Sequence, residues 1–142
     1  MAERFQLDPA FEATSIALGG LALCEARLQN DARYPWIVLI PRSPNAREIE
    51  DLHPLNRARL MDEIVHAGRA VRAVGQALGL AVEKLNVGAL GNVTPQLHVH
   101  VVGRRAGDPA WPGPVWGQGE AVRFPPEQLA AAVAAAKKGL HL

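Results

Sequence analysis

The sequence has very little cysteine and no excess of charge of either sign. Of its 142 residues only Cys24 is a cysteine, which excludes an intrachain disulfide and a thiolate zinc site and favours a reducing compartment. Fifteen basic side chains nearly balance 14 acidic ones, and the formal net charge is +1. This balance gives no overall attraction to nucleic acid or to an anionic membrane, so we expect no partner of either kind and only local recognition of phosphate.

Long apolar runs are also lacking. The N-terminal segment MAERFQLDPAF is charged from its third residue and has no apolar centre, unlike a secretory signal peptide. No uncharged apolar stretch elsewhere is long enough to span a bilayer. We therefore expect a cytoplasmic protein with one domain, residues 1–142, that buries roughly 68% of the surface of its unfolded chain.

The alternation of apolar segments and turn residues predicts several strands. Residues 21–29 and 36–42 are apolar and are joined by NDARYP, so they predict a hairpin. Residues 84–92 begin as a strand and end in a glycine-containing loop that leads into QLHVHVV. The first twenty residues predict a short helix or turn with an edge strand at 4–7.

Two segments predict helices. Over residues 55–78 apolar side chains recur at steps of three and four, which indicates one long amphipathic helix that ends at Gly79. PPEQLAAAVAAAKKGL has prolines and an acid at its start and two lysines at its end, as the helix dipole favours. The segment 104–120, rich in glycine and proline, is expected to be irregular, with Trp111 and Trp116 packing over the sheet or serving as a lid over a ligand. Together these elements indicate an α+β fold with a mostly antiparallel sheet of about five strands, a long central helix and a C-terminal helix.

QLHVHVV, residues 96–102, has the most informative pattern in the chain. In a strand, Gln96, His98 and His100 share one face, because side chains alternate with a period of two. One interpretation is that the histidines are polar residues on a half-exposed sheet face. A second is a zinc or iron site, which no carboxylate or cysteine nearby in the sequence supports.

A third interpretation is nucleophilic catalysis at phosphorus. An imidazole whose N–H is held by a backbone carbonyl keeps its other nitrogen bare for attack, and a strand fixes this arrangement. A second imidazole, about 7 Å further along the same face, can bind a phosphate oxygen. The adjacent glycine-containing loop offers backbone N–H groups to the same phosphate.

QLHVHVV resembles the signature of the histidine-triad (HIT) family, His-φ-His-φ-His-φ-φ with φ apolar, with Gln96 in place of the first histidine. The upstream NVGALGN resembles the approach loop of the family, and LQNDARYPWIVLIPR resembles its nucleoside-binding hairpin. REIEDLHPLNRARLM resembles the segment that leads into its long helix. The resemblance implies a HIT-like fold, a purine nucleotide substrate and a homodimer.

The resemblance further implies a nucleotide hydrolase or nucleotidyl transferase that attacks the α-phosphate of a dinucleoside polyphosphate, such as diadenosine tetraphosphate, or of a nucleoside phosphoramidate. His98 matches the nucleophile that forms a nucleotidyl-histidine intermediate, and His100 matches the histidine that contacts the phosphate. Gln96 completes the implied catalytic set. The implied substrate-binding residues are Asn86, Gly91, Asn92 and Thr94 in the approach loop, and Asn30 or Asp31 for the ribose hydroxyls.

Two residues depart from the pattern of the family. Gln96 replaces a histidine, and Trp36 stands where many members carry another histidine. These departures leave open an alternative function, a purine-nucleotide-binding module with weak or no turnover. The resemblance implies no metal or cofactor held by the protein, and Mg²⁺ enters only together with a polyphosphate substrate.

Overall fold

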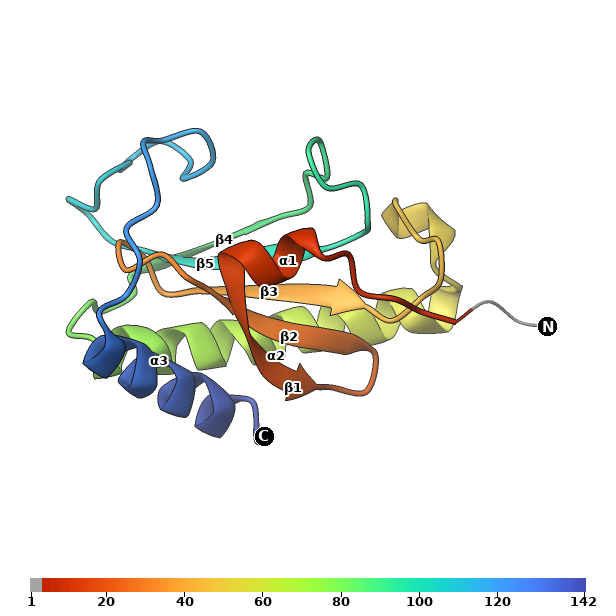
Figure 1. Cartoon of the computed structure of the whole chain (residues 1–142), viewed down its shortest axis with the longest axis horizontal. Helices are drawn as coiled ribbons and strands as arrows, with labels where there is room; N and C mark the ends of the chain where they lie inside the picture. The colour runs from red at the N-terminus through yellow and green to blue at the C-terminus, as the bar shows by residue number, and fades with distance from the viewer. Residues whose placement is uncertain (1–3) are drawn as a thin grey trace.

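A five-stranded antiparallel sheet organises the protein, whose computed structural model describes residues 4–142 (Figure 1). The strand order is β1-β2-β3-β5-β4, and every neighbouring pair is antiparallel. The predicted α+β fold is confirmed. In chain order the elements are α1 (Ala10–Thr14), β1 (Ser15–Gly20), β2 (Cys24–Gln29), β3 (Trp36–Pro41), the 3-10 turn η1 (Ile49–Asp51), α2 (Pro54–Ala77), β4 (Lys84–Gly88), β5 (Val99–Arg104) and α3 (Pro126–Gly139).

The N-terminal part of the sheet differs from the prediction. The strand predicted at residues 4–7 is wrong, because these residues form no regular element and the first strand is β1. The backbone around residues 6 and 8 bonds to the side chain of Gln96 instead of to a neighbouring strand. The strand predicted at 21–29 begins only at Cys24, because residues 21–23 form the turn between β1 and β2.

The two faces of the sheet have different covers. Ile37, Leu39 and Val101 pack with residues of α2 and α3, which lie on one side of the sheet (Figure 1). The opposite face packs against α1 and the loop 105–125. Its buried residues include Trp36 and Val38 of β3. None of the helices in the described part of the chain is long and apolar enough to cross a membrane.

A buried ion pair fastens the irregular loop 105–125 to the end of β5. Arg104 is 1% exposed, and its guanidinium donates to both carboxylate oxygens of Asp108 at 2.8 and 2.9 Å. Asp108 also accepts from the backbone N–H of Trp111. Because both charges are paired where water is excluded, the start of this loop is held firmly beside the sheet.

Candidate functional site

His98 and His100 lie side by side at the start of β5. Their ring centroids are 4.9 Å apart in an edge-on arrangement. His98 immediately precedes the strand, and His100 lies opposite Val38 of β3 and Gly88 of β4. The pairing with two neighbouring strands fixes the backbone below His100, so the two imidazoles are held in one relative position.

The ring of His98 has a fixed orientation. Its Nδ1 lies 2.7 Å from the backbone carbonyl oxygen of Gln96, and Phe11 packs edge-on against it at 4.9 Å between centroids. A carbonyl only accepts, so Nδ1 carries the proton in the neutral ring and Nε2 keeps its lone pair. The structure therefore contains the contact between imidazole and carbonyl that the sequence predicts for a nucleophile.

His100 is held in a different way. The indole Nε1 of Trp36 donates to its Nδ1 at 3.0 Å, and the rings of Trp36 and Trp116 stand edge-on to it at 5.5 and 5.6 Å. Burial, followed by the proximity of His98, lowers the pKa of His100 from 6.5 to about 4. The His100 ring is consequently neutral near pH 7.

A pocket of about 230 Å³ adjoins His98. Its walls come from the loop after β4, including Gly91, and from the connection between β3 and α2, including Arg47, Glu48 and Glu50. Gly91 has a φ of 68°, which suits glycine. Such a volume is small for a whole dinucleotide and is closer to that of a phosphate group with part of a nucleoside.

Gln96 contacts the N-terminal segment rather than the histidine rings. Its side-chain oxygen accepts from the backbone N–H of Asp8 at 2.8 Å, and its amide nitrogen donates to the carbonyl of Gln6 at 2.8 Å. Both ends of the amide are thus hydrogen-bonded, and the two bonds bring residues 6–8 next to the segment that precedes β5. In this position the side chain of Gln96 acts as an attachment point for the N-terminal segment.

The predicted residues of the approach loop are divided between two positions. Asn86 lies in β4 opposite Val102 and accepts a hydrogen bond from Arg104 at 2.8 Å, so its oxygen is already used. Gly91 lines the pocket beside His98, whereas Asn92 is exposed and Thr94 is half-buried. Of these residues, Gly91 is the one that the structure brings to the same pocket as His98.

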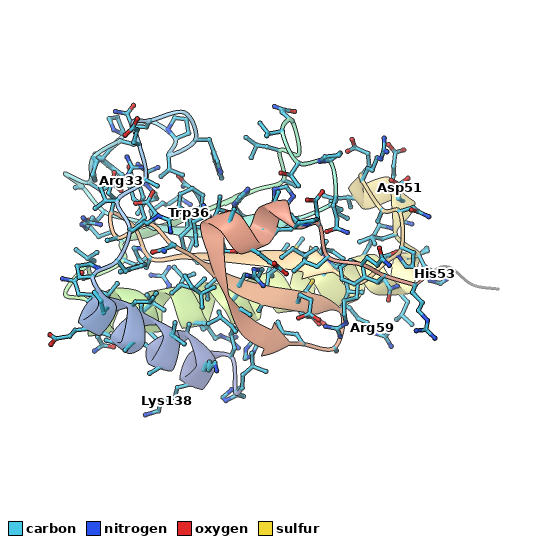
Figure 2. The ribbon with its side chains drawn as sticks, in the orientation of Figure 1. Arg33, Trp36, Asp51, His53, Arg59 and Lys138 are labelled. Carbon is cyan, nitrogen blue, oxygen red and sulfur yellow. The ribbon has the colours of Figure 1, made fainter. Side chains whose placement is uncertain are left out.

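The two predicted ribose-binding residues fasten the C-terminal segment to the hairpin turn. Asn30 accepts from the backbone N–H of Phe124, and Asp31 accepts from that of Val122 and from the guanidinium of Arg33. Asp31 is 1% exposed, whereas Asn30 is half-buried. Arg33 and Trp36 lie toward one end of the molecule and Asp51 and His53 toward the other (Figure 2).

Two contributors to the site, Phe11 packing on His98 and Arg47 lining the pocket, were not predicted. Trp36 was noted only as a departure from histidine, and its hydrogen bond to His100 was not predicted. The antiparallel register of β3 and β5 pairs Trp36 with Val102, which puts Trp36 diagonally across from His100. Assigning that register from the two apolar strands would have found Trp36, whereas no sequence signal connects Phe11 or Arg47 with the histidines.

The described residues contain no group of three or more His, Cys, Asp or Glu side chains that could hold a metal ion. His98 and His100 are neighbours, but within residues 4–142 no third such ligand joins them. Cys24 is fully buried, and burial raises the pKa of its thiol far above the usual value. The expectation that the protein holds no metal stays a prediction.

Comparisons with known proteins match one family model and several solved structures. The family model described as "HIT domain" matches residues 10–107. A histidine triad protein from Sinorhizobium meliloti is 43% identical with a TM-score of 0.86, covering 96% of this chain and 97% of its own. One from Marinobacter aquaeolei is 39% identical with a TM-score of 0.88, covering 98% of each chain. One from Bradyrhizobium japonicum is 37% identical with a TM-score of 0.90, covering 97% of this chain and 99% of its own. A search of curated protein sequences found no match.

Proposed function

This chain belongs to the HIT domain family, and from that membership we propose that it hydrolyses or transfers a nucleoside monophosphate group taken from a larger purine nucleotide. HIT-family proteins are generally nucleotide-binding hydrolases or transferases. The observation that supports the proposal most directly is the 2.7 Å contact between Nδ1 of His98 and the carbonyl of Gln96. It leaves Nε2 of His98 with the lone pair that a nucleophile needs.

In the proposed reaction, Nε2 of His98 attacks the α-phosphorus of the substrate. The new P–N bond forms as the bond from phosphorus to the leaving group breaks, and the leaving group keeps the electron pair of that bond. Water then attacks the nucleotidyl-histidine, the P–N bond breaks, a proton passes to solvent and a nucleoside monophosphate is released. An acceptor other than water gives nucleotidyl transfer, and His100 donates a hydrogen bond to a phosphate oxygen in both steps.

The proposed position of the phosphate is the pocket beside His98. Backbone N–H groups of the loop at Gly91 are the proposed donors on the loop side, and Asn92 and Thr94, which are not among the residues that line this pocket, stay predicted contacts. The guanidinium of Arg47, on the opposite wall beside the carboxylates of Glu48 and Glu50, is the proposed contact for a second phosphate of a polyphosphate chain. The side-chain oxygen of Asn86 already accepts a hydrogen bond from the guanidinium of Arg104. Its proposed contribution to the site is therefore to hold Arg104 in place.

The leaving group favoured by this arrangement is a phosphate rather than an amine. A departing amine needs a proton, whereas a departing phosphate chain is stable as an anion. The amide of Gln96 is not an acid and is bound to residues 6 and 8, and His100 is neutral near pH 7. The preferred substrate class is therefore a dinucleoside polyphosphate, with nucleoside phosphoramidates turned over more slowly.

Burial favours Asn30 over Asp31 as the ribose-binding residue. Asp31 is 1% exposed and is paired with Arg33, so a ribose hydroxyl could reach its carboxylate only if the turn opened. Asn30 is half-buried, and its amide nitrogen remains available for a ribose hydroxyl while its oxygen accepts from Phe124. Replacing Asn30 by alanine is expected to raise KM more than it lowers kcat.

The test is product analysis with diadenosine tetraphosphate and an AMP-amine conjugate in water labelled with ¹⁸O. Attack at the α-phosphorus yields AMP and ATP from the polyphosphate, with the label in AMP alone. Label in ATP would contradict attack by His98 at the α-phosphorus. Tight binding of AMP with no turnover of either substrate would favour the alternative function, a nucleotide-binding module without activity.

The homodimer stays a prediction that light scattering of the purified protein tests. Within the described chain, β4 is an edge strand of the sheet, and Val87 on it is 50% exposed. A molecular mass of one chain at micromolar concentration would contradict the expectation. The cytoplasmic location also stays a prediction, which fractionation of the source cells would test.

A further inference from the structure

The hydrogen bond between Trp36 and His100 determines which nitrogen of His100 carries the proton. The indole Nε1 lies 3.0 Å from Nδ1 of His100. An indole N–H can only donate, so Nδ1 of His100 must accept and must be unprotonated. In the neutral ring the proton is then on Nε2, which is the opposite tautomer to that of His98, whose Nδ1 donates to the carbonyl of Gln96.

Both Nε2 atoms are open to a ligand. Neither makes a hydrogen bond within residues 4–142, and neither belongs to the buried atoms that lack a partner there. The ring centroids of His98 and His100 are 4.9 Å apart, so the lone pair on one Nε2 and the N–H on the other are close enough to meet a single phosphate group. A tetrahedral phosphate suits this pair, because its phosphorus accepts the lone pair while one of its oxygens accepts the N–H.

We infer that Trp36 is a positioning residue that holds His100 as the Nε2–H tautomer and so makes His100 a hydrogen-bond donor toward the substrate phosphate. This inference rests on the proposed function for the identity of the ligand. In the opposite tautomer, Nε2 of His100 would direct a lone pair at the phosphate oxygens and repel them. Although position 36 departs from histidine, its tryptophan keeps His100 able to donate a hydrogen bond from Nε2.

The surroundings of Trp36 keep its indole in place. Its side chain is 6% exposed, its ring stands edge-on to Tyr34 at 6.2 Å and to Trp116 at 6.4 Å, and its backbone pairs with Val102. The hydrogen bond from Trp36 also opposes protonation of His100, because both nitrogens of an imidazolium carry a proton and neither can accept the indole N–H. Among the residues described, His98 is the one titratable group whose charge lowers the pKa of His100.

Trp116 provides a matched control for Trp36. Both indole rings stand edge-on to His100 at nearly the same distance, 5.5 Å for Trp36 and 5.6 Å for Trp116. The Nε1 of Trp116 has no hydrogen-bond partner within the described residues, whereas that of Trp36 donates to His100. Replacing either residue by phenylalanine thus makes a similar change in the ring beside His100, and only Trp36→Phe removes a hydrogen bond to His100.

The experiment is ¹⁵N NMR of the substrate-free protein with labelled histidine. The wild type is expected to show His98 as Nδ1–H and His100 as Nε2–H. In Trp36→Phe the Nδ1–H form of His100 becomes detectable and its pKa rises by about one pH unit, because the hydrogen bond to the neutral ring is lost. Trp116→Phe leaves the tautomer of His100 unchanged. A wild-type His100 in the Nδ1–H form, an unchanged Trp36→Phe spectrum or an equal effect of Trp116→Phe would each overturn the inference.

A second measurement does not depend on the folding of a Trp36 variant. The indole N–H resonance of Trp36 in the wild type is expected to lie downfield of those of the other tryptophans and to move upfield in His100→Phe, which has no acceptor. A resonance that does not move would contradict the hydrogen bond. Both measurements need no substrate, so inactivity of the wild type toward nucleotides would count against the proposed function and leave the tautomer result intact.

Discussion

Gln96 reaches His98 through its backbone and not through its side chain. The carbonyl oxygen of Gln96 is 2.7 Å from Nδ1 of His98, whereas the amide of Gln96 is bonded to Gln6 and Asp8. Because every residue type has this carbonyl, glutamine at position 96 leaves the orientation and tautomer of His98 unaffected. The proposed nucleophile can thus be retained although the first residue of the signature is not histidine.

Removing the His98 imidazole is expected to abolish the covalent intermediate. Turnover of a dinucleoside polyphosphate by His98→Ala falls by orders of magnitude, while the affinity for AMP changes little. His100→Ala loses one donor to the phosphate, which lowers kcat on the order of 100-fold but still allows the intermediate to form. Rapid quench with a labelled nucleotide should trap an acid-labile, base-stable phosphoramidate on the wild type and on His100→Ala alone. Label on His98→Ala would identify a different nucleophile.

Gln96→Ala is expected to loosen the N-terminal segment without removing the chemistry. It deletes the two hydrogen bonds to Gln6 and Asp8, which costs about 1 to 2 kcal/mol of unfolding free energy. Urea unfolding measures this loss. Because the contact between the backbone and His98 persists, kcat should fall less than tenfold. A fall as large as that of His98→Ala would place the Gln96 amide in the reaction.

The fold could be predicted because each element has a local signal of its own. The helix α2 was expected at 55–78 and spans Pro54–Ala77, since a repeat of apolar residues over many turns is unambiguous. The strand β1, SIALGG, was not expected, because its last two residues are glycines and its register shifts between Ala17 and Gly19. The pairing with β2 stabilises this strand, and a single segment carries no signal of such pairing.

The site could be predicted only where its parts are close in sequence. The shared face of His98 and His100 follows from their spacing, and the loop at Gly91 is part of the same segment. Trp36 and Phe11 reach the histidines from other elements through long-range contacts. In the structure Asn30 and Asp31 accept hydrogen bonds from backbone N–H groups. Polar side chains in a turn are equally compatible with binding a ligand, so the sequence alone does not distinguish the two roles.

Glu63→Ala is expected to destabilise the fold strongly. The carboxylate of Glu63 is buried and accepts from the backbone N–H groups of Leu23 at 2.8 Å and Cys24 at 2.9 Å. Without it both N–H groups lose their partner, which costs about 3 kcal/mol by urea unfolding. Glu63→Gln keeps one acceptor and should lose less. Asp62→Ala, at an exposed neighbouring position on α2, is the control, and an equal loss there would show that the two hydrogen bonds do not matter.

The half-buried His100 should make the stability of the protein depend on pH between about 6.5 and about 4. Above pH 6.5 the ring is neutral in both the folded and the unfolded chain, and the full stability is present. As the pH falls toward 4, His100 binds a proton in the unfolded chain but stays neutral in the folded chain, so the free energy of unfolding decreases. The separation of the two pKa values corresponds to a loss of at most about 3 kcal/mol, complete below about pH 4.

His100→Gln isolates this effect, because glutamine does not titrate and its side-chain oxygen can still accept from the indole of Trp36. Urea unfolding at pH 7 and at pH 4.5 should give a smaller decrease for the variant than for the wild type. The difference between the two decreases measures the contribution of His100, since the other titratable groups are common to both proteins. Equal decreases would mean that His100 takes up its proton as readily in the folded chain as in the unfolded one. That outcome would contradict the desolvation of the ring and the unprotonated Nδ1 that the hydrogen bond from Trp36 requires.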